Sequence, residues 1–182
     1  MVQHAVDYEE VRKVVHRWAS RFSDVTCIWE KPDKPRPKLP YIALHVLTPK
    51  IKSGQDDVIQ KTNDTYTVSG QRSMVVSVTS HYADQEDEEA INVISNLEAS
   101  LENPIALEVL RAGGLAYWSN TQVQDISTAL ETGFENRITF DVTFGLVSSI
   151  DEDVGRIEST QVDGQIKDAE DNTVVEPSIT IP

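Results

Sequence analysis

The stretch RITFDVTFGLV (137–147) alternates apolar and polar residues over nearly its whole length. In a β-strand, successive side chains point to opposite faces of the sheet, so this period of two is typical of a half-buried strand. The pattern therefore predicts one face that packs into a core and one that does not. The expected inward residues are Ile138, Phe140, Val142, Phe144 and Leu146, and the expected outward ones are Thr139, Asp141 and Thr143.

Further strands are expected before this one. The segment NDTYTVSGQRSMVVSVTSHY (63–82) reads as two strands that meet in a hairpin turn at Ser69-Gly70. YIALHVL (41–47) is apolar on both alternating sets, which is typical of a central strand covered on both faces. Shorter strands are predicted at 25–30 and within 115–127.

Two loops are predicted between these strands. KPDKPRPKLP (31–40) holds four prolines and cannot be helical, because proline lacks the backbone N–H. TPKIKSGQDD (48–57) reads as a polar excursion, and the polar run out to residue 64 suits a surface loop.

Three segments have the apolar spacing of amphipathic helices. DYEEVRKVVHRWASRF (7–22) places Val11, Val14, Val15, Trp18 and Phe22 on one face, with Asp7 as its N-cap. The second helix is predicted over 83–103 with Asp84 as N-cap and an apolar stripe of Ala90, Ile94, Leu97 and Leu101. A short third helix begins at Pro104 and ends at Gly113-Gly114.

This order of elements predicts an α+β fold. We expect a mixed, mostly antiparallel sheet with two main helices packed on it. The domain is predicted to span residues 1–150, and residues 151–182 to form an extended, acidic C-terminal arm. The arm has no apolar stripe and cannot close a core, but it contains β-branched runs such as IESTQVDGQI and VVEPSITI. We expect it to add to a neighbouring subunit or ring by strand addition, so that truncation at Ile150 leaves a folded domain that docks poorly.

The composition excludes several classes of protein. The chain has 182 residues, enough for about one domain, and a net charge of −14, which argues against a general nucleic-acid binder and against binding to anionic membranes. The charge is uneven: residues 1–72 carry 12 basic and 9 acidic residues, whereas residues 73–182 carry 4 and 21. Such a split provides two complementary faces, although acidic residues also serve solubility alone.

The chain also lacks the marks of secretion or membrane insertion. Cys27 is the only cysteine, so an intrachain disulfide and a multi-cysteine metal site are excluded. No apolar run approaches the ~18 residues of a membrane span, and the opening MVQHAVDYEE is not the pattern of a signal peptide. We expect a soluble protein made in a reducing cytoplasm.

No constellation of catalytic residues is evident. His45 and His81 lie in predicted strands and could be neighbours, but without a third ligand they are more simply structural. The acidic run at 86–89 is explained by the first turn of a helix, and Cys27 in an apolar strand is expected to be an inert, buried thiol. The sequence predicts no catalytic, cofactor-binding or metal-binding residues and hence no enzyme.

Five segments follow one another in a characteristic order over residues 7–150. They are PKLPYIALHVL (37–47), GQRSMVVSVTSHYAD (70–84), EDEEAINVISNLEASLENP (86–104), GGLAYWSNTQVQDIS (113–127) and FENRITFDVTF (134–144). In that order and spacing, the chain resembles the neck or tail terminator proteins of long-tailed bacteriophages.

The resemblance implies a structural virion protein that is assembled in the host cytoplasm. It implies a homo-oligomer, a ring of six copies, that caps the tail tube protein and meets the head-side connector or stopper protein, with the tail sheath as a further neighbour. Genomic DNA would pass through the lumen without specific binding, and no cofactor is implied. Two alternatives stay open on the residues: another tail or head-completion structural protein, or a small acidic enzyme or ligand-binding domain.

Three charged residues are the candidate subunit contacts. Arg72 and Arg137 are expected to open strands, with Glu135 close to the second. We expect both arginines to pair with carboxylates, either within the subunit or across the ring. The simpler alternative is an exposed charge at a strand end, worth about 0–1 kcal/mol.

Overall fold

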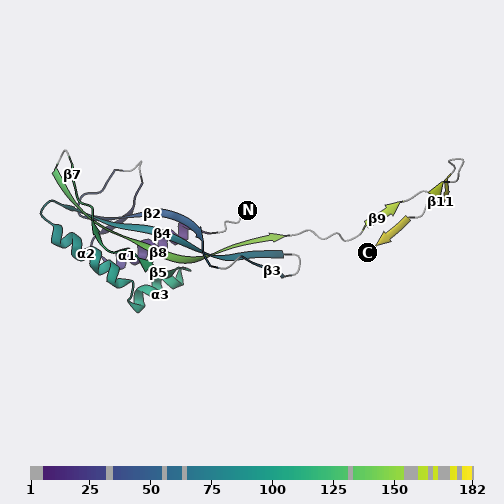
Figure 1. The fold of residues 1–182 in the computed structure, drawn as a ribbon, viewed down its shortest axis with the longest axis horizontal. Coiled ribbons are helices and arrows are strands. Elements are labelled where there is room, and N and C mark those ends of the chain that lie inside the picture. Colours follow the sequence, from purple (N-terminus) through teal and green to yellow (C-terminus); the bar gives the residue numbers. More distant parts are fainter. Residues whose placement is uncertain are drawn as a thin grey trace.

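Two long antiparallel strands form the centre of the fold in a computed structural model (Figure 1). These are β4 (Thr65–Ala83) and β8 (Gly133–Asp153), and all 19 residues of β4 have partners in β8. The register runs without a shift from Thr65 opposite Asp153 to Ala83 opposite Glu135. The structure describes residues 6–31, 35–54, 57–62, 65–130, 133–153, 160–163, 166–167, 173–175 and 178–181.

The main sheet has eight strands, in the order β1-β2-β4-β8-β5 with three short strands beside this path. Only β1 and β2 pair in parallel, and every other pair in the sheet is antiparallel. β3 pairs with β4, while β6 and β7 pair with β8. The bounds are β1 (Thr26–Trp29), β2 (Tyr41–Lys52), β3 (Val58–Thr62), β5 (Ala116–Asn120), β6 (Gln124–Asp125) and β7 (Thr128–Leu130).

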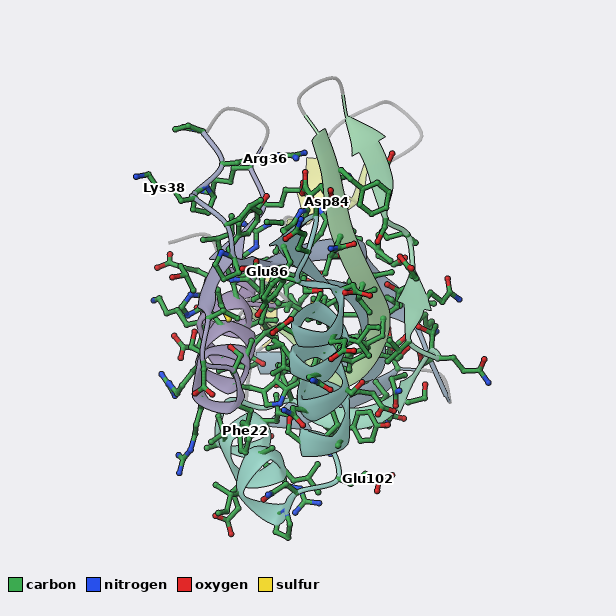
Figure 2. All side chains as sticks on the ribbon, turned by 90° about the vertical axis from the view of Figure 1, so that its left-hand side faces the viewer. Phe22, Arg36, Lys38, Asp84, Glu86 and Glu102 are labelled. Carbon is green, nitrogen blue, oxygen red and sulfur yellow. The ribbon has the colours of Figure 1, made fainter. Side chains whose placement is uncertain are left out.

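Three helices lie on one face of this sheet (Figures 1 and 2). α1 (Tyr8–Phe22) begins as predicted, because the Asp7 carboxylate accepts hydrogen bonds from the backbone N–H groups of Glu9 and Glu10. α3 (Pro104–Ala112) is capped in the same way by Asn103. α2 (Asp87–Ser100) packs against β4 and β8.

The core lies between the helices and the sheet. It contains the five predicted inward residues of β8, together with Met74, Val76 and Val78 of β4 and the predicted apolar stripe of α2. Trp18 is fully buried in this core, where its indole N–H donates to the Ser100 hydroxyl and its ring meets Phe144 edge-on. The predicted α+β fold, with helices on a mixed and mostly antiparallel sheet, is therefore confirmed.

The predicted hairpin at Ser69-Gly70 is wrong, because β4 continues through both residues. The chain reverses instead between β3 and β4, where Thr62 lies opposite Thr65. Glycine at position 70 leaves room for the side chains of Asp57 and Arg72. A Cβ there would lie 2.0 Å from a carboxylate oxygen of Asp57 and 2.6 Å from a nitrogen of Arg72. The polar excursion predicted at 48–57 is also shorter than expected, since β2 continues to Lys52 and β3 begins at Val58.

Two smaller predictions also need correction. α2 begins at Asp87 rather than at 83, because β4 extends to Ala83 and leaves Asp84 outside the helix. The N-cap is Glu86, not Asp84, and its side chain caps no helical N–H group. β2 is covered on both faces only over Tyr41–Leu44, and Leu47 at its far end is exposed.

Beyond β8, the described residues form two small strand pairs. β9 (Thr160–Asp163) pairs with β12 (Ser178–Ile181), and β10 (Ile166–Lys167) pairs with β11 (Thr173–Val175). Figure 1 shows them far from the helices. β8 continues three residues past the predicted domain boundary at 150, and much of the predicted strand region at 154–167 lies outside the described residues.

Candidate functional site

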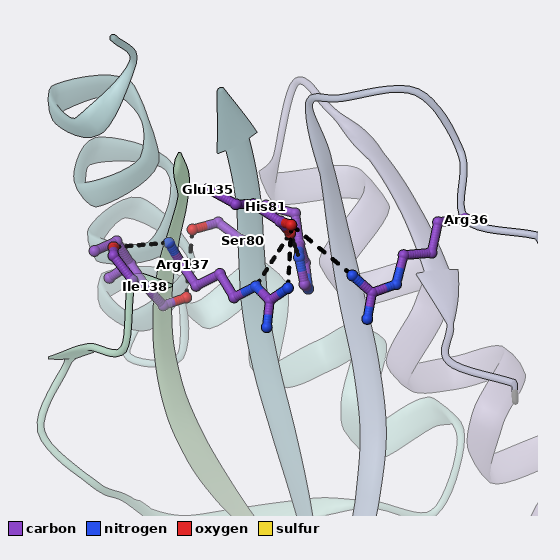
Figure 3. A network of polar contacts seen from close by, with 7 residues as sticks. Arg36, Ser80, His81, Glu135, Arg137 and Ile138 are labelled. Atoms are coloured by element: carbon purple, nitrogen blue, oxygen red, sulfur yellow. Dashed lines mark hydrogen bonds and ion pairs between the residues drawn. The ribbon is translucent and has the colours of Figure 1, made fainter. Parts of the chain in front are cut away.

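A buried carboxylate lies close to the end of the sheet where β4 ends and β8 begins (Figure 3). The two Glu135 oxygens accept hydrogen bonds of 3.1 Å from the Nε and Nη2 atoms of Arg137, an arrangement with two parallel bonds. His81 on β4 lies opposite Arg137, and its Nδ1 is 2.5 Å from Glu135 Oε1. Glu135 is 7% exposed, and both of its carboxylate oxygens face hydrogen-bond donors.

These contacts determine the charge of each group. Burial by itself would raise the pKa of Glu135, but the hydrogen bonds and positive charge of Arg137, with the His81 bond, outweigh it and lower the pKa to about 2. Burial lowers the pKa of His81, against the opposing effect of Glu135. At neutral pH the cluster thus holds an ionised carboxylate and a neutral imidazole whose Nδ1–H faces the carboxylate.

The rim of this cluster reaches the proline-rich segment. Nη1 of the exposed Arg36 lies 3.9 Å from Glu135 Oε2, and the Tyr41 ring stacks on His81 with 4.5 Å between centroids. A cavity of about 530 Å³ adjoins them, lined by residues that include Trp29, Pro35 and His45. Since the carboxylate is already saturated by donors, the arrangement favours a structural joint over a site of proton transfer.

The second predicted arginine forms a separate pair. Arg72 is 7% exposed and donates from Nη2 to Asp57 Oδ2 at 2.7 Å. The hydrogen bond from Arg72 lowers the pKa of Asp57, and the same bond raises that of Arg72. The prediction that both arginines open their strands is wrong. β4 and β8 begin earlier than expected, at Thr65 and Gly133, so Arg72 and Arg137 lie inside them.

The predicted carboxylate partners of Arg72 and Arg137 thus lie within the same chain. The simpler alternative, an exposed charge at a strand end, is wrong for Arg72, because this residue is buried in the interior of β4. Contact of Arg72, Arg137 or Glu135 with a second copy stays a prediction. The contact of His81 with Glu135 was not predicted from the sequence, because no motif joins a histidine in one strand to a carboxylate in another.

One end of the sheet carries aliphatic side chains on its surface. We call this part the ribbon: β3, with Thr65–Gly70 of β4 and Ser148–Asp153 of β8, which Figure 1 shows extending beyond the helices. Ile59, Val68 and Ile150 lie directly opposite one another across its three strands. Ile59 is 66% exposed and Ile150 is 46% exposed on this face of the ribbon. Val58 and Val147 are exposed on its opposite face, because side chains alternate along a strand, and Leu47 and Ile51 are exposed on the neighbouring β2.

Such a grouping of exposed apolar side chains marks an interaction surface more often than a free one. The surface loop predicted out to residue 64 is wrong at Val58–Thr62, which form β3 of the ribbon. The signal that could have found the surface is the pair Val58-Ile59 followed by Val68 and Ile150, which become neighbours only once the strand pairing is known.

No metal or nucleophile site is found in the part of the chain that the structure describes. His45 and His81 are not neighbours: His81 pairs with Tyr41, four residues from His45 on β2, and His45 lies 3.6 Å from Glu30. The described residues contain no group of three or more metal-ligating side chains. Cys27 is buried in β1, and none of the described helices is long and apolar enough to cross a membrane.

The comparison with known families is decisive. A family model described as phage neck terminator protein matches residues 8–170. The chain belongs to the phage neck terminator family. This neck terminator is therefore a structural protein of a bacteriophage virion, in the tail and neck region, and it interacts with other phage proteins there. The match extends into the predicted arm, beyond the residues that carried the resemblance, and no curated protein matches the chain.

Proposed function

We propose that this neck terminator closes into a ring of six copies that caps the last ring of the tail tube, ends tube growth and joins the tube to the head-side connector or stopper protein. The family supports the neck location. The ribbon is the observation that carries the contact with the tube, because an exposed aliphatic surface suits a permanent, largely apolar interface. The protein acts as a structural component rather than as an enzyme.

The acidic surface suits a conduit for DNA. With a net charge of −14, a ring of copies repels a duplex that passes through its lumen, so the genome moves without specific binding. The virion is the place of function in this proposal, and assembly takes place in the host cytoplasm.

Ribbon variants test the contact with the tube. Ile59→Lys and Ile150→Lys each place a charge in the exposed row, and because both side chains are already exposed, folding is expected to change by no more than about 0.5 kcal/mol. In a phage deleted for the terminator gene and complemented with either variant, we expect tails of irregular length and a large loss of infectious particles. Electron micrographs of the tails give the length distribution.

The matched control is Ile105→Lys on α3, where the side chain is 48% exposed, close to the 46% of Ile150. We expect this variant to give tails of normal length. Normal tails with all three variants would mean that the ribbon does not contact the tube. Normal tails in the deleted phage itself would contradict the proposed function as a whole.

A further inference from the structure

A basic groove of about 750 Å³ runs along the exposed face of α1. Its lining includes Arg12, Lys13, Arg17 and Arg21 of α1, with Trp29 and Lys31 on the other side. Lys13, Arg17 and Arg21 repeat every four residues, and Arg12 lies beside Lys13. All four are exposed, whereas Val11, Val14 and Trp18 of the same helix are buried. In a protein with a net charge of −14, this is a strong local excess of positive charge.

Part of this charge has no partner within the described part of the chain. Lys13 pairs with Glu9 at 2.9 Å, and the Arg12 guanidinium lies over the Trp29 ring, 5.3 Å from its centroid. Among the residues that the structure describes, no ion pair is found for Arg17, Arg21 or Lys31, all of which are exposed. The groove therefore combines free cations with a half-buried aromatic anchor, a combination common at protein interfaces.

The complementary charge lies at the start of α2. Asp84, Asp87, Glu88 and Glu89 are exposed, and no ion pair is found for any of them within the described ranges. Figure 2 shows Asp84 and Glu86 at one end of α2, which stands beside α1. Residues 73–182 hold only four basic residues, and one of these, Arg137, is bound to Glu135. Most of the cations that could pair with this turn therefore lie in residues 1–72, which hold 12 of the 16 basic residues.

We propose that the groove on α1 binds the acidic first turn of α2 from a second copy of this chain. Each copy carries one groove and one acidic turn. In a head-to-tail arrangement the groove of each copy binds the turn of the next, and such a chain of contacts can close into a ring. The contact rests on the proposed ring and identifies the two faces that build it. Because the cations and carboxylates involved are exposed, the contact depends strongly on ionic strength.

Charge reversal tests the contact in the purified full chain. Arg17→Glu, Arg21→Glu and Lys31→Glu together leave Arg12 and Lys13 against four carboxylates and so make the groove acidic. Asp87→Lys, Glu88→Lys and Glu89→Lys together place three lysines against Asp84 and Glu86 and so make the turn basic. We expect wild-type protein to associate at low salt, and the association to be lost at about 1 M NaCl, where the Debye length is about 3 Å. Each triple variant alone should remain monomeric in native mass spectrometry, with a circular dichroism spectrum like that of the wild type.

An equimolar mixture of the two triple variants is the decisive experiment. An acidic groove now faces a basic turn on the other variant, and an unchanged basic groove faces an unchanged acidic turn, so alternating assemblies should form. Restored association also shows that the variants are folded. Glu102→Lys, in the turn before α3, with Glu108→Lys on α3 is the control for a change of charge of the same sign elsewhere on the surface, and it should associate like the wild type.

Three results would overturn the inference: a wild type that is monomeric at every concentration at low salt, variants that associate normally, or a mixture that does not associate. Loss of binding to a fluorescent DNA duplex in the groove variant, with self-association intact, would identify nucleic acid as the occupant. The tail-length measurement on the ribbon variants is independent of all these results, so the proposed function can stand when this contact fails.

Discussion

Glu135 is the side chain whose ionisation contributes most clearly to stability. Its pKa is about 2 in the folded chain against an ordinary 4.5, so its stabilising effect is complete above pH 4.5 and is lost as the pH falls toward 2. His81 acts in the same direction, because its lowered pKa favours the neutral form, and protonation below its ordinary value of 6.5 favours the unfolded chain. The cluster thus makes the protein sensitive to acid.

Replacement of this carboxylate should therefore have an effect that depends on pH. We expect Glu135→Gln to lower the free energy of unfolding at pH 7 by about 3 kcal/mol, because Arg137 loses its buried counter-charge. The difference from the wild type should shrink as the pH falls from 4.5 toward 2. Urea unfolding across this range measures it, and Glu30→Gln, at a half-exposed carboxylate, should change stability by only about 0.5 kcal/mol. A constant difference at all pH values would contradict the prediction.

At this scale the sequence predicted the core better than the polar contacts. The inward residues of β8 and the buried face of α1 follow from periodicity, since a period of 2 or 3.6 is a local property. The pairing of Glu135 with His81 depends on the register of two strands 54 residues apart, and no local pattern encodes it. Glu135 and Arg137 lie two residues apart, so the period of a strand places them on one face, whereas no local pattern identifies Asp57 as the partner of Arg72.

The end of α3 lies very close to α1. A Cβ on Gly113 would lie 2.1 Å from Cγ2 of Val14, which is fully buried and has the restricted rotamers of a β-branched residue. Gly113 has φ −98° and ψ 16°, which other residues also adopt, so the requirement for glycine is steric. This contact fixes the distance between the two helices.

A double-mutant cycle at this contact tests the argument. We expect Gly113→Ala to destabilise the protein by about 1–3 kcal/mol through overpacking. Combined with Val14→Ala, which vacates the space, it should cost less than the sum of the single effects by about 1 kcal/mol. Gly114→Ala is the control: its φ of +74° gives a strain of about 1 kcal/mol with no atom within 4 Å, and Val14→Ala should not relieve it.

The boundaries of elements were the least predictable part of the fold. Ser69-Gly70 has the composition of a hairpin turn, but it forms the ladder with Ser149 and Ser148 of β8. A nineteen-residue strand can pass through a glycine when neighbouring strands hold it: Gly70 pairs with Ser148 of β8, and Ser69 has partners in both β3 and β8. That support comes from distant residues, which explains why local turn chemistry was misleading here.

On the scale of the whole molecule, the strands beyond β8 remain a predicted arm for contacts with a neighbour. Truncation after Asp153 preserves every β4–β8 pair, whereas the truncation at Ile150 predicted from sequence also removes the partners of Thr65, Tyr66 and Thr67. We expect the chain that ends at Asp153 to keep the thermal midpoint of the full chain but to yield few infectious particles in complementation. A midpoint that falls sharply, or a normal yield of particles, would show that the arm is not a docking element.

The uninterrupted pairing of β4 with β8 has a mechanical consequence. The ribbon is joined to the helix-covered part of the sheet mainly by these two strands, which run along the length of the molecule. A pull applied to the ribbon along this axis loads the interstrand hydrogen bonds in shear, all together, whereas a pull across the strands would break them one after another. A subunit held at its ribbon is therefore stiffest against a pull along its own length.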